Sequence, residues 1–283
     1  MEFKARNYVF DLKDAPVIMG ILNITPDSFS DGGNFINEDK ALFHCEKMIL
    51  EGADAIDIGG ESSRPGSERI SVTEELDRIS NIVEKIKTNF DICLSVDTYK
   101  PEVAEEVLNL GADIINDITG LTYSEDIAKL TSKFDTGLCL MHMKADPKTM
   151  QVNVEYDNII SEIKDFLQES VNKSIAFGMK KGSIIIDPGI GFGKDLKGNL
   201  TILNNLNKFT DLGCPILIGT SRKSFIGQMN GKEVNERLNG TIASNVIALI
   251  NGARIFRVHD VKENKDALFV TNEIIRSGEM IEA

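Results

Sequence analysis

Eight short apolar runs alternate with longer amphipathic segments along this chain of 283 residues, and this alternation limits the possible fold more than any other feature. The runs are almost continuously apolar and rich in Ile, Val and Leu, which is typical of parallel strands that are buried on both faces. They span residues 16–23, 55–59, 92–96, 113–116, 137–141, 183–187, 215–219 and 254–258. The pattern therefore predicts repeated β–α units.

The segments between the runs carry apolar residues at three- and four-residue spacing, which predicts amphipathic helices. These helices are expected over residues 38–51, 72–88, 100–109, 155–177, 234–251 and 260–277, with weaker patterns at 123–133 and 199–208. Pro101 stands in a first helical turn, where its missing N–H is not needed. Gly52, Gly111, Gly178 and Gly252 follow helices at positions typical of C-terminal caps.

Eight β–α units predict an α/β fold, a (β/α)8 TIM barrel formed by one domain over residues 1–283, with its active site at the C-terminal rim of eight parallel strands. A doubly wound open sheet is the alternative. That fold usually has fewer strands, and the turn NITPDSFSDGG after the first run does not have its G-x-G-x-x-G fingerprint. Residues 1–13 are expected to form a small hairpin that closes the bottom of the barrel.

Composition restricts the possible partners and location. The net charge of −13 argues against a nucleic-acid partner, which normally needs a basic surface. No run approaches the roughly 18 apolar residues of a membrane span, and the first residues lack the apolar core of a signal peptide. A cytoplasmic protein without a membrane partner is expected. The four cysteines are scattered without a C-x-x-C pair, which indicates buried thiols rather than zinc ligands.

A polar residue stands at or just after the end of every run, where barrel enzymes place their chemistry. These residues are Asn23, Glu61 to Arg64, Asp97, Asn116, His142, Asp187, Ser221 to Lys223, Arg257 and His259. Each has a structural alternative: Asp97 and Asp187 suit helix caps, Asn23 and Asn116 suit turns, and His142 suits a half-buried position. Their convergence at one rim nevertheless predicts a functional site.

The residue types at this rim indicate a class of ligand. Carboxylates and amides accept the paired N–H donors of a flat polar heterocycle. Arg64, Arg257 and His259 suit a polyanion such as pyrophosphate, and Asn23 suits a magnesium ion shared with substrate phosphates. Two polar, Gly-rich loops at 24–33 and 59–68 are typical of lids that complete a barrel site. The rim is therefore predicted to bind a polar heterocycle that carries a phosphate leaving group.

Eight segments, in order along nearly the whole chain, resemble the motifs of the dihydropteroate synthase family. They are GILNITPDSFSDGG (20–33), IDIGGESSRPG (56–66), SVDTYKPEV (95–103), INDITG (115–120), CLMHMKADPKTMQ (139–151), IIIDPGIGFGK (184–194), GTSRKSFIG (219–227) and RVHDV (257–261). The resemblance implies condensation of 6-hydroxymethyl-7,8-dihydropterin pyrophosphate with p-aminobenzoate to 7,8-dihydropteroate and pyrophosphate in folate biosynthesis. It also implies a dissociative substitution assisted by Mg²⁺, and a homodimer.

The resemblance further implies a role for each site residue. It assigns pterin binding to Asp97, Asn116, Met141, Asp187 and Lys223. It assigns pyrophosphate binding to Asn23, Arg64, Arg257 and His259, with magnesium at Asn23. It assigns p-aminobenzoate binding to Phe29, Ser63, Arg64, Phe192, Lys223 and Ser224. The residues implied in catalysis are Asp31, Lys223, Arg257 and His259, with Asp31 placed to stabilise a pterin cation.

The chain departs from the family pattern at one position, and two other functions share part of its motifs. Ser63 stands where the family often has Thr, and the lost methyl is expected to alter loop packing slightly and bears on sulfonamide sensitivity. A corrinoid-dependent methyltransferase barrel shares the pterin-binding acids and amides, but it has no use for the DSFSDGG and S-R-K-S segments. A non-catalytic pterin-binding paralogue should have lost loop residues, yet Asp31, Arg64, Lys223 and Arg257 are all present.

Overall fold

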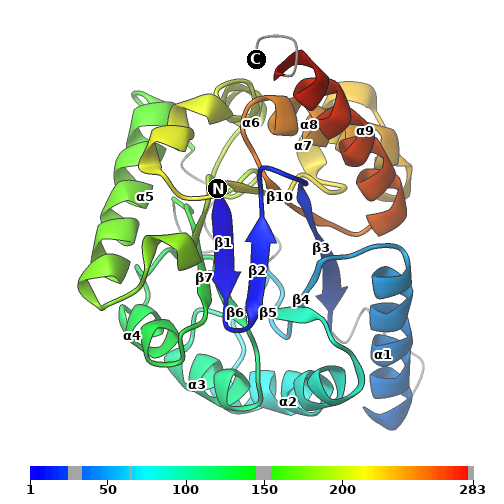
Figure 1. Ribbon diagram of the computed structural model, residues 1–283, viewed down its shortest axis with the longest axis vertical. Coiled ribbons are helices and arrows are strands. Elements are labelled where there is room, and N and C mark those ends of the chain that lie inside the picture. Colours follow the sequence, from blue (N-terminus) through cyan, green and yellow to red (C-terminus); the bar gives the residue numbers. More distant parts are fainter. Residues whose placement is uncertain (25–33, 64–65, 145–153, 280–283) are drawn as a thin grey trace.

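The computed structural model describes residues 1–24, 34–63, 66–144 and 154–279. Within these residues, eight parallel strands form one sheet in the order β8-β7-β6-β5-β4-β3-β10-β9, surrounded by helices (Figure 1). A parallel bridge between Ile186 and Ile216 joins the two ends of that order and closes the sheet into a barrel. The predicted (β/α)8 fold is therefore confirmed.

The strands follow the apolar runs closely. A short antiparallel pair, β1 (Glu2–Ala5) and β2 (Tyr8–Asp11), precedes the barrel. The barrel strands are β3 (Val17–Asn23), β4 (Ala55–Gly59), β5 (Cys93–Asp97), β6 (Ile114–Asp117), β7 (Gly137–Met141), β8 (Ile184–Asp187), β9 (Leu217–Ile218) and β10 (Ile255–Val258). Seven of them begin and end within one residue of the prediction, whereas β9 is shorter than the predicted 215–219.

The helices occupy the amphipathic segments. They are α1 (Asn34–Leu50), α2 (Val72–Asn89), α3 (Pro101–Asn109), α4 (Asp126–Lys133), α5 (Ile159–Ala176), α6 (Leu196–Asn204), α7 (Ser224–Asn230), α8 (Leu238–Ile250) and α9 (Val261–Glu279). The predicted helix at 199–208 is wrong in its bounds, because α6 begins earlier and a 3-10 helix over Leu206–Leu212 follows it. Helix α7 was not predicted, because its seven residues are too few for a periodic pattern.

Local sequence explains where several helices begin and end. The side chains of Ser71, Asn158 and Asp195 accept hydrogen bonds from the first turns of α2, α5 and α6, which satisfies backbone donors that have no partner within the helix. The four predicted cap glycines all have φ between 95° and 105°, a conformation that other residues rarely adopt: Gly52, Gly111, Gly178 and Gly252.

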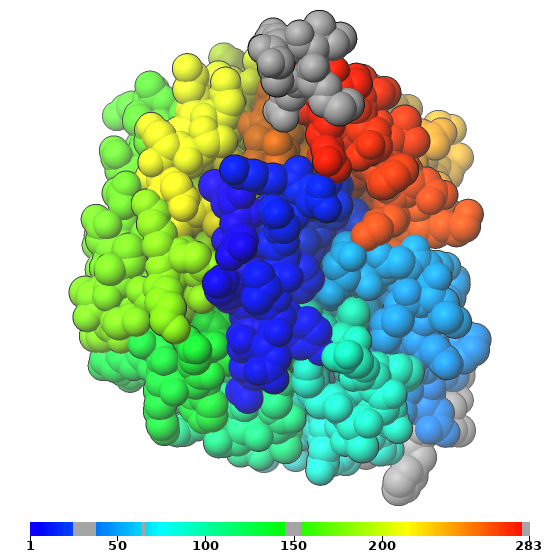
Figure 2. Space-filling view, viewed as in Figure 1, coloured from blue at the N-terminus to red at the C-terminus, as the bar shows by residue number. Residues whose placement is uncertain are grey.

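The N-terminal hairpin of β1 and β2 plugs one end of the barrel. Phe3 and Leu12 are 1% exposed and pack against the first residues of barrel strands, among them Val17, Cys93 and Ile255. Figures 1 and 2 look at this end, and the hairpin crosses the centre of the view. The predicted closure of the barrel bottom is confirmed. Polar chemistry is thereby confined to the opposite end, where the strands have their carboxyl termini.

Two predictions from composition can also be compared with the structure. All four cysteines are buried free thiols, as expected: Cys45, Cys93, Cys139 and Cys214. None of the described helices combines the length and the apolar character needed to cross a membrane.

Candidate functional site

The strand register brings the predicted site residues together at the carboxyl end of the barrel. Asn23 lies opposite Gly59, Gly59 opposite Asp97, and Asp97 opposite Asn116, so four neighbouring strands end at one level. Asp187 on β8 follows further round the same rim. The side chains of Asp97, Asn116 and Asp187 are all at least nine-tenths buried. Residues more than 160 positions apart in the chain therefore share one site.

Arg257 forms the centre of this site. Its Nε donates to Asp57 Oδ2 at 2.6 Å, and its Nη2 donates to Asp97 Oδ2 at 3.3 Å. Asp57 is fully buried and also accepts a hydrogen bond from Ser95 Oγ at 2.6 Å. Burial opposes the charge on Arg257, but the carboxylates of Asp57 and Asp97 outweigh it and raise the pKa of the guanidinium. A fixed cation thus lies among the acids of the rim.

The two rim carboxyls that end β5 and β8, Asp97 and Asp187, have perturbed pKa values. Burial raises the pKa of Asp97 to about 8, and the charge of Arg257 opposes this rise. Burial also raises the pKa of Asp187, against the charge of Lys223 and a hydrogen bond from the Gly189 N–H to Asp187 Oδ1 at 2.7 Å. Acids with such shifts are typical of functional sites.

The alternative role proposed for Asp97 and Asp187 was that of a helix cap, and neither residue caps a helix. Asp97 caps no helix, since α3 begins after Lys100 without a side-chain cap. Asp187 does hold a turn through Gly189, but α6 is capped by Asp195 instead. Asp187 therefore keeps one carboxylate oxygen beyond the turn that it stabilises.

A cation and an aromatic ring lie together beside Asp187. Lys223 Nζ is 4.6 Å from the centroid of the Phe192 ring, and it donates a hydrogen bond to the carbonyl of Ile190. Burial lowers the pKa of Lys223 to about 8, against the charge of Asp187. Phe192 packs against a small buried cluster formed by Tyr99, Ile118 and Met141. The rim thus has an apolar wall next to an ammonium whose pKa is lowered.

His259 is held by Ser221, which lies in the loop after β9. Its Nδ1 lies 2.9 Å from Ser221 Oγ, and its backbone N–H donates to the same oxygen at 3.1 Å. Ser221 Oγ thus contacts both the ring and the backbone of His259. Next to it, Arg222 pairs with Asp260 through two hydrogen bonds. The ring of His259 is therefore oriented before any substrate binds.

His142 has a structural role, which favours the alternative given for it above. Its side chain is buried, and burial lowers its pKa to about 2, so that the ring is neutral. Its Nδ1 lies 3.0 Å from Lys194 Nζ, which also donates to the carbonyls of His142 at 3.2 Å and Phe192 at 2.8 Å. Lys194 and His142 together hold the loop after β8 that carries Phe192.

The remaining predicted residues are placed as follows. Asn23 is half-buried at the end of β3, and its side chain has no hydrogen bond with any residue in the described part of the chain. Ser63 is half-buried after β4, and Ser224 is exposed as the first residue of α7. Three predicted residues lie outside the described ranges: Phe29, Asp31 and Arg64.

Sequence reasoning missed several residues that organise this site. Asp57 is the main omission, although a charged residue in the middle of the apolar run AIDIG was a usable signal. Ser95 has the same signal in ICLSV. Lys194 and Asn199 carried none, because the contacts of each are specific to the folded loop: Asn199 Oδ1 accepts the N–H of Gly191 at 2.6 Å.

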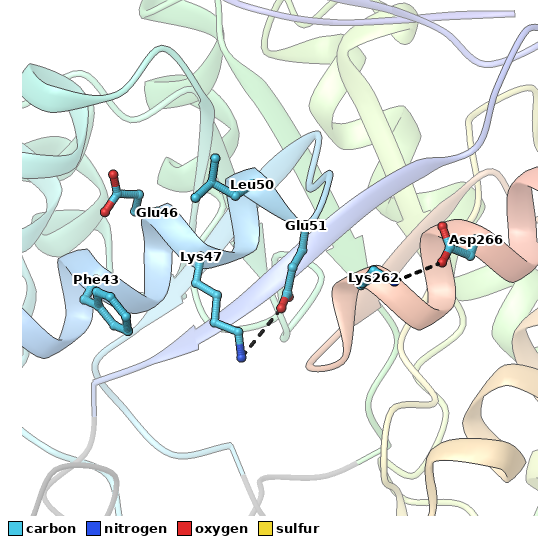
Figure 3. Close-up of a pocket in the computed structure, with 7 residues that line it drawn as sticks. All are labelled: Phe43, Glu46, Lys47, Leu50, Glu51, Lys262 and Asp266. Atoms are coloured by element: carbon cyan, nitrogen blue, oxygen red, sulfur yellow. Dashed lines mark ion pairs between the residues drawn. The ribbon is translucent and has the colours of Figure 1, made fainter.

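A surface pocket of about 390 Å³ lies elsewhere, on the outside of the helical ring between α1 and α9 (Figure 3). It is lined by Phe43, Glu46, Lys47, Leu50, Glu51, Lys262 and Asp266. The ion pairs Lys47–Glu51 and Lys262–Asp266 measure 3.6 and 3.7 Å and each joins residues of one helix. No predicted site residue lines this pocket, so the chemistry is assigned to the rim.

The fold and the rim together define a TIM-barrel enzyme whose carboxyl-end site combines acids, an amide and fixed cations. The model of the pterin binding enzyme family matches residues 19–259. The chain is 47% identical to a dihydropteroate synthase of Clostridium beijerinckii over 94% of this chain and 97% of the relative, and 44% identical to that of Escherichia coli over 99% and 98%.

Solved structures agree with these relatives. A Yersinia pestis dihydropteroate synthase in complex with a sulfonamide drug has a TM-score of 0.91 and 44% identity, over 98% of this chain and 100% of that chain. A Xanthomonas albilineans dihydropteroate synthase with 4-aminobenzoic acid has a TM-score of 0.89 and 37% identity, over 96% and 97%. The chain belongs to the dihydropteroate synthase family of pterin binding enzymes, and its activity is that of a folate-pathway transferase. The predicted family and activity are confirmed, and they are favoured over the two alternatives, a corrinoid-dependent methyltransferase and a non-catalytic paralogue.

Proposed function

We propose that the rim binds the ring of 6-hydroxymethyl-7,8-dihydropterin pyrophosphate through Asp97, Asn116 and Asp187. The observation that carries this proposal is the convergence of these three buried acceptors at one end of the barrel. Carboxylate and amide oxygens accept the neighbouring N–H donors of a pterin ring in pairs. Met141, buried beside them, packs against the face of the ring.

The pyrophosphate lies next to the pterin subsite, against Arg257 and His259. The support is the geometry of these two residues. Arg257 is held among acids by Asp57, and His259 is oriented by Ser221, so both are positioned before charge develops on the leaving group. The family resemblance assigns Arg64 to the same group of pyrophosphate-binding residues.

Magnesium binds with the pyrophosphate at Asn23. The donor set fits such an ion, since the amide oxygen of Asn23 stands at the rim without a hydrogen bond to the described residues. Among those residues, no three of the types His, Cys, Asp and Glu form a metal-binding group. Magnesium usually takes one or two protein ligands together with phosphates and waters. When bound, the ion neutralises negative charge on the leaving pyrophosphate.

p-Aminobenzoate occupies the space beside Lys223 and Phe192. The ammonium of Lys223 faces the Phe192 ring, which suits a ligand with an aromatic ring and a carboxylate. Ser63, after β4, and Ser224, at the start of α7, line this subsite, with Phe29 and Arg64 assigned to it by resemblance. A Yersinia pestis relative has been solved in complex with a sulfonamide drug, and we expect such drugs to bind this subsite.

The reaction is a substitution at the methylene carbon of the pterin. The bond between that carbon and the pyrophosphate oxygen breaks first, while Arg257 and His259 stabilise the departing charge. Asp31 stabilises the resulting pterin cation. The arylamine nitrogen, already unprotonated at neutral pH, forms the new C–N bond and then loses one proton. No strong general base is required, which agrees with the neutral, structural state of His142.

Release of pyrophosphate that depends on p-aminobenzoate, measured with the pterin pyrophosphate and Mg²⁺, tests this proposal. Lys223→Ala is expected to raise KM for p-aminobenzoate and to lower kcat, because this side chain lies between the two subsites. Lys262→Ala, on the outer surface at the start of α9, is the control and should behave as wild type. An absence of release by the wild-type protein, or an equal effect of the two variants, would contradict the proposed site.

The assembly and location are part of the same proposal. Exposed apolar side chains gather on the last two helices, which suits pairing with a second copy: Ile247, Ile250, Phe269, Val270 and Ile274. We expect a homodimer, which sedimentation equilibrium measures. The four buried, unpaired cysteines suit a reducing compartment and thus a cytoplasmic location.

A further inference from the structure

The ammonium of Lys100 joins two distant points of the loop after β4. Lys100 stands three residues after Asp97, and its side chain is 5% exposed. Its Nζ donates to Glu61 Oε2 at 2.7 Å, to Glu75 Oε2 at 2.6 Å and to the carbonyl of Ile70 at 2.8 Å. An ammonium has three N–H donors, so all of them are used. Glu61 and Ile70, nine residues apart, are thereby held on one atom.

The same two points are also bonded directly. The N–H of Ile70 donates to Glu61 Oε2 at 3.0 Å, and the hydroxyl of Tyr99 donates to Glu61 Oε1 at 2.7 Å. One step further along the loop, Ser67 Oγ donates to the carbonyl of Ser62. The two arms of the loop therefore lie side by side, and both oxygens of Glu61 are engaged.

The direction in which the chain leaves β4 is fixed as well. A Cβ on Gly60 would lie 2.8 Å from Ile79 Cγ2 and 3.2 Å from Glu75 Cγ, so the backbone packs directly on α2 at this point. The carbonyl of Gly60 accepts a hydrogen bond from Arg78 Nη1 at 2.8 Å. These contacts fix the point at which the chain leaves β4, three residues before Ser63.

Stability alone is a poor reason for this cluster. It surrounds one ammonium with two carboxylates, of which Glu75 is 1% exposed. Removing such charges from water is costly, and well-packed apolar residues often stabilise a fold as much or more. What the charges do provide is a single geometry, since each hydrogen bond has a defined length and direction.

We propose that Glu61 and Lys100 are positioning residues that hold Ser63 at the rim and thereby set the affinity for p-aminobenzoate. This inference rests on the assignment of Ser63 to that subsite in the proposed function. Lys100 also ties the loop to β5, so the p-aminobenzoate side of the site is built on the strand that carries Asp97.

Glu61→Ala tests this role, because the Lys100–Glu75 pair remains and the fold keeps a balanced charge. KM for p-aminobenzoate is expected to rise about tenfold, as misplacement of a binding group does, while KM for the pterin pyrophosphate stays unchanged. Glu75→Gln is the matched control: it weakens a contact to the same ammonium but leaves the loop bonded, and both KM values should stay unchanged. Tyr99→Phe removes one bond to Glu61 and should give a smaller rise in KM for p-aminobenzoate.

Hydrogen exchange of the Ile70 amide provides a readout that does not depend on activity. Exchange should accelerate in Glu61→Ala and stay slow in Glu75→Gln. The inference is overturned if Glu61→Ala leaves KM for p-aminobenzoate unchanged, or if Glu75→Gln raises it equally. A different result, in which Ile70 exchanges faster but Ser63→Ala has a normal KM, would overturn the assignment of Ser63 and leave the anchoring of the loop confirmed.

Discussion

Replacing Asp57 with Asn should reveal how strongly the site depends on one carboxylate inside the barrel. Asp57 is fully buried, and it bonds Arg257 Nε and Ser95 Oγ, each at 2.6 Å. Removal of one partner from a buried ion pair costs about 3–5 kcal/mol. Arg257 keeps Asp97 at 3.3 Å, and its side chain is 20% exposed, so the lower end of that range applies.

The Asn side chain keeps one oxygen that accepts a hydrogen bond, which reduces the loss further. We therefore expect Asp57→Asn to lower the free energy of unfolding by about 2–3 kcal/mol and the melting temperature by about 5 °C. Urea unfolding followed by circular dichroism measures the first quantity. The loss should persist in 1 M NaCl, since a buried pair is screened far less than an exposed one.

Asp266→Asn is the control. Asp266 pairs with Lys262 at 3.7 Å, and both side chains are about 70% exposed, so a change of less than about 0.5 kcal/mol is expected. Asp57→Asn should also reduce kcat/KM for the pterin pyrophosphate about tenfold, because Arg257 is then less firmly oriented. A stability loss equal to that of the control, together with normal kinetics, would refute the reasoning.

Three further predictions concern the rim. Asp187→Asn should weaken pterin binding by about 1–3 kcal/mol, because one acceptor becomes a donor; calorimetry measures this, and unchanged affinity would give Asp187 a different role. The pKa of Asp97 is raised to about 8, so the ionised form increases as pH rises from 6 through 8; kcat/KM for the pterin pyrophosphate should rise through this range and level off only about one pH unit above the pKa, and a wild-type slope in Asp97→Asn would contradict the assignment. Gly189→Ala should cost at least about 2 kcal/mol, because φ is +71° and the new Cβ would lie 2.0 Å from the carbonyl oxygen of His142; thermal unfolding tests this against Gly182→Ala, whose new Cβ would lie 4.0 Å from the carbonyl oxygen of Glu2, and equal melting temperatures would rule it out.

Much of the fold was predictable because its signals are local. Alternation of apolar runs and amphipathic segments depends only on neighbouring residues, and it gave barrel strands within one residue of the observed ends in seven cases. Cap glycines such as Gly111 mark helix ends for the same reason. Where local signals were weak, at α7 and β9, the prediction missed or overextended the element.

The location of these residues at the rim was predictable, but the contacts between them were not. Asp97, Asn116 and Asp187 follow apolar runs, so a barrel must bring them to one rim. The partner of Arg257 could not be read in this way, because Asp57 lies 200 residues away in the chain and inside a strand. His142 is the reverse case: its position after a strand suggested a rim residue, whereas its burial and its contact with Lys194 favour the structural alternative.

By itself, the sequence determined the architecture and the chemical character of the rim, since apolar periodicity and strand-end residue types are properties of short segments. Tertiary structure decided the pairings and the protonation states. The ion pairs of Asp57 with Arg257 and of Glu61 with Lys100 form only after the barrel has closed. The physical reason is that desolvation and charge–charge energies depend on distances between residues far apart in the chain, and those distances exist only in the folded protein.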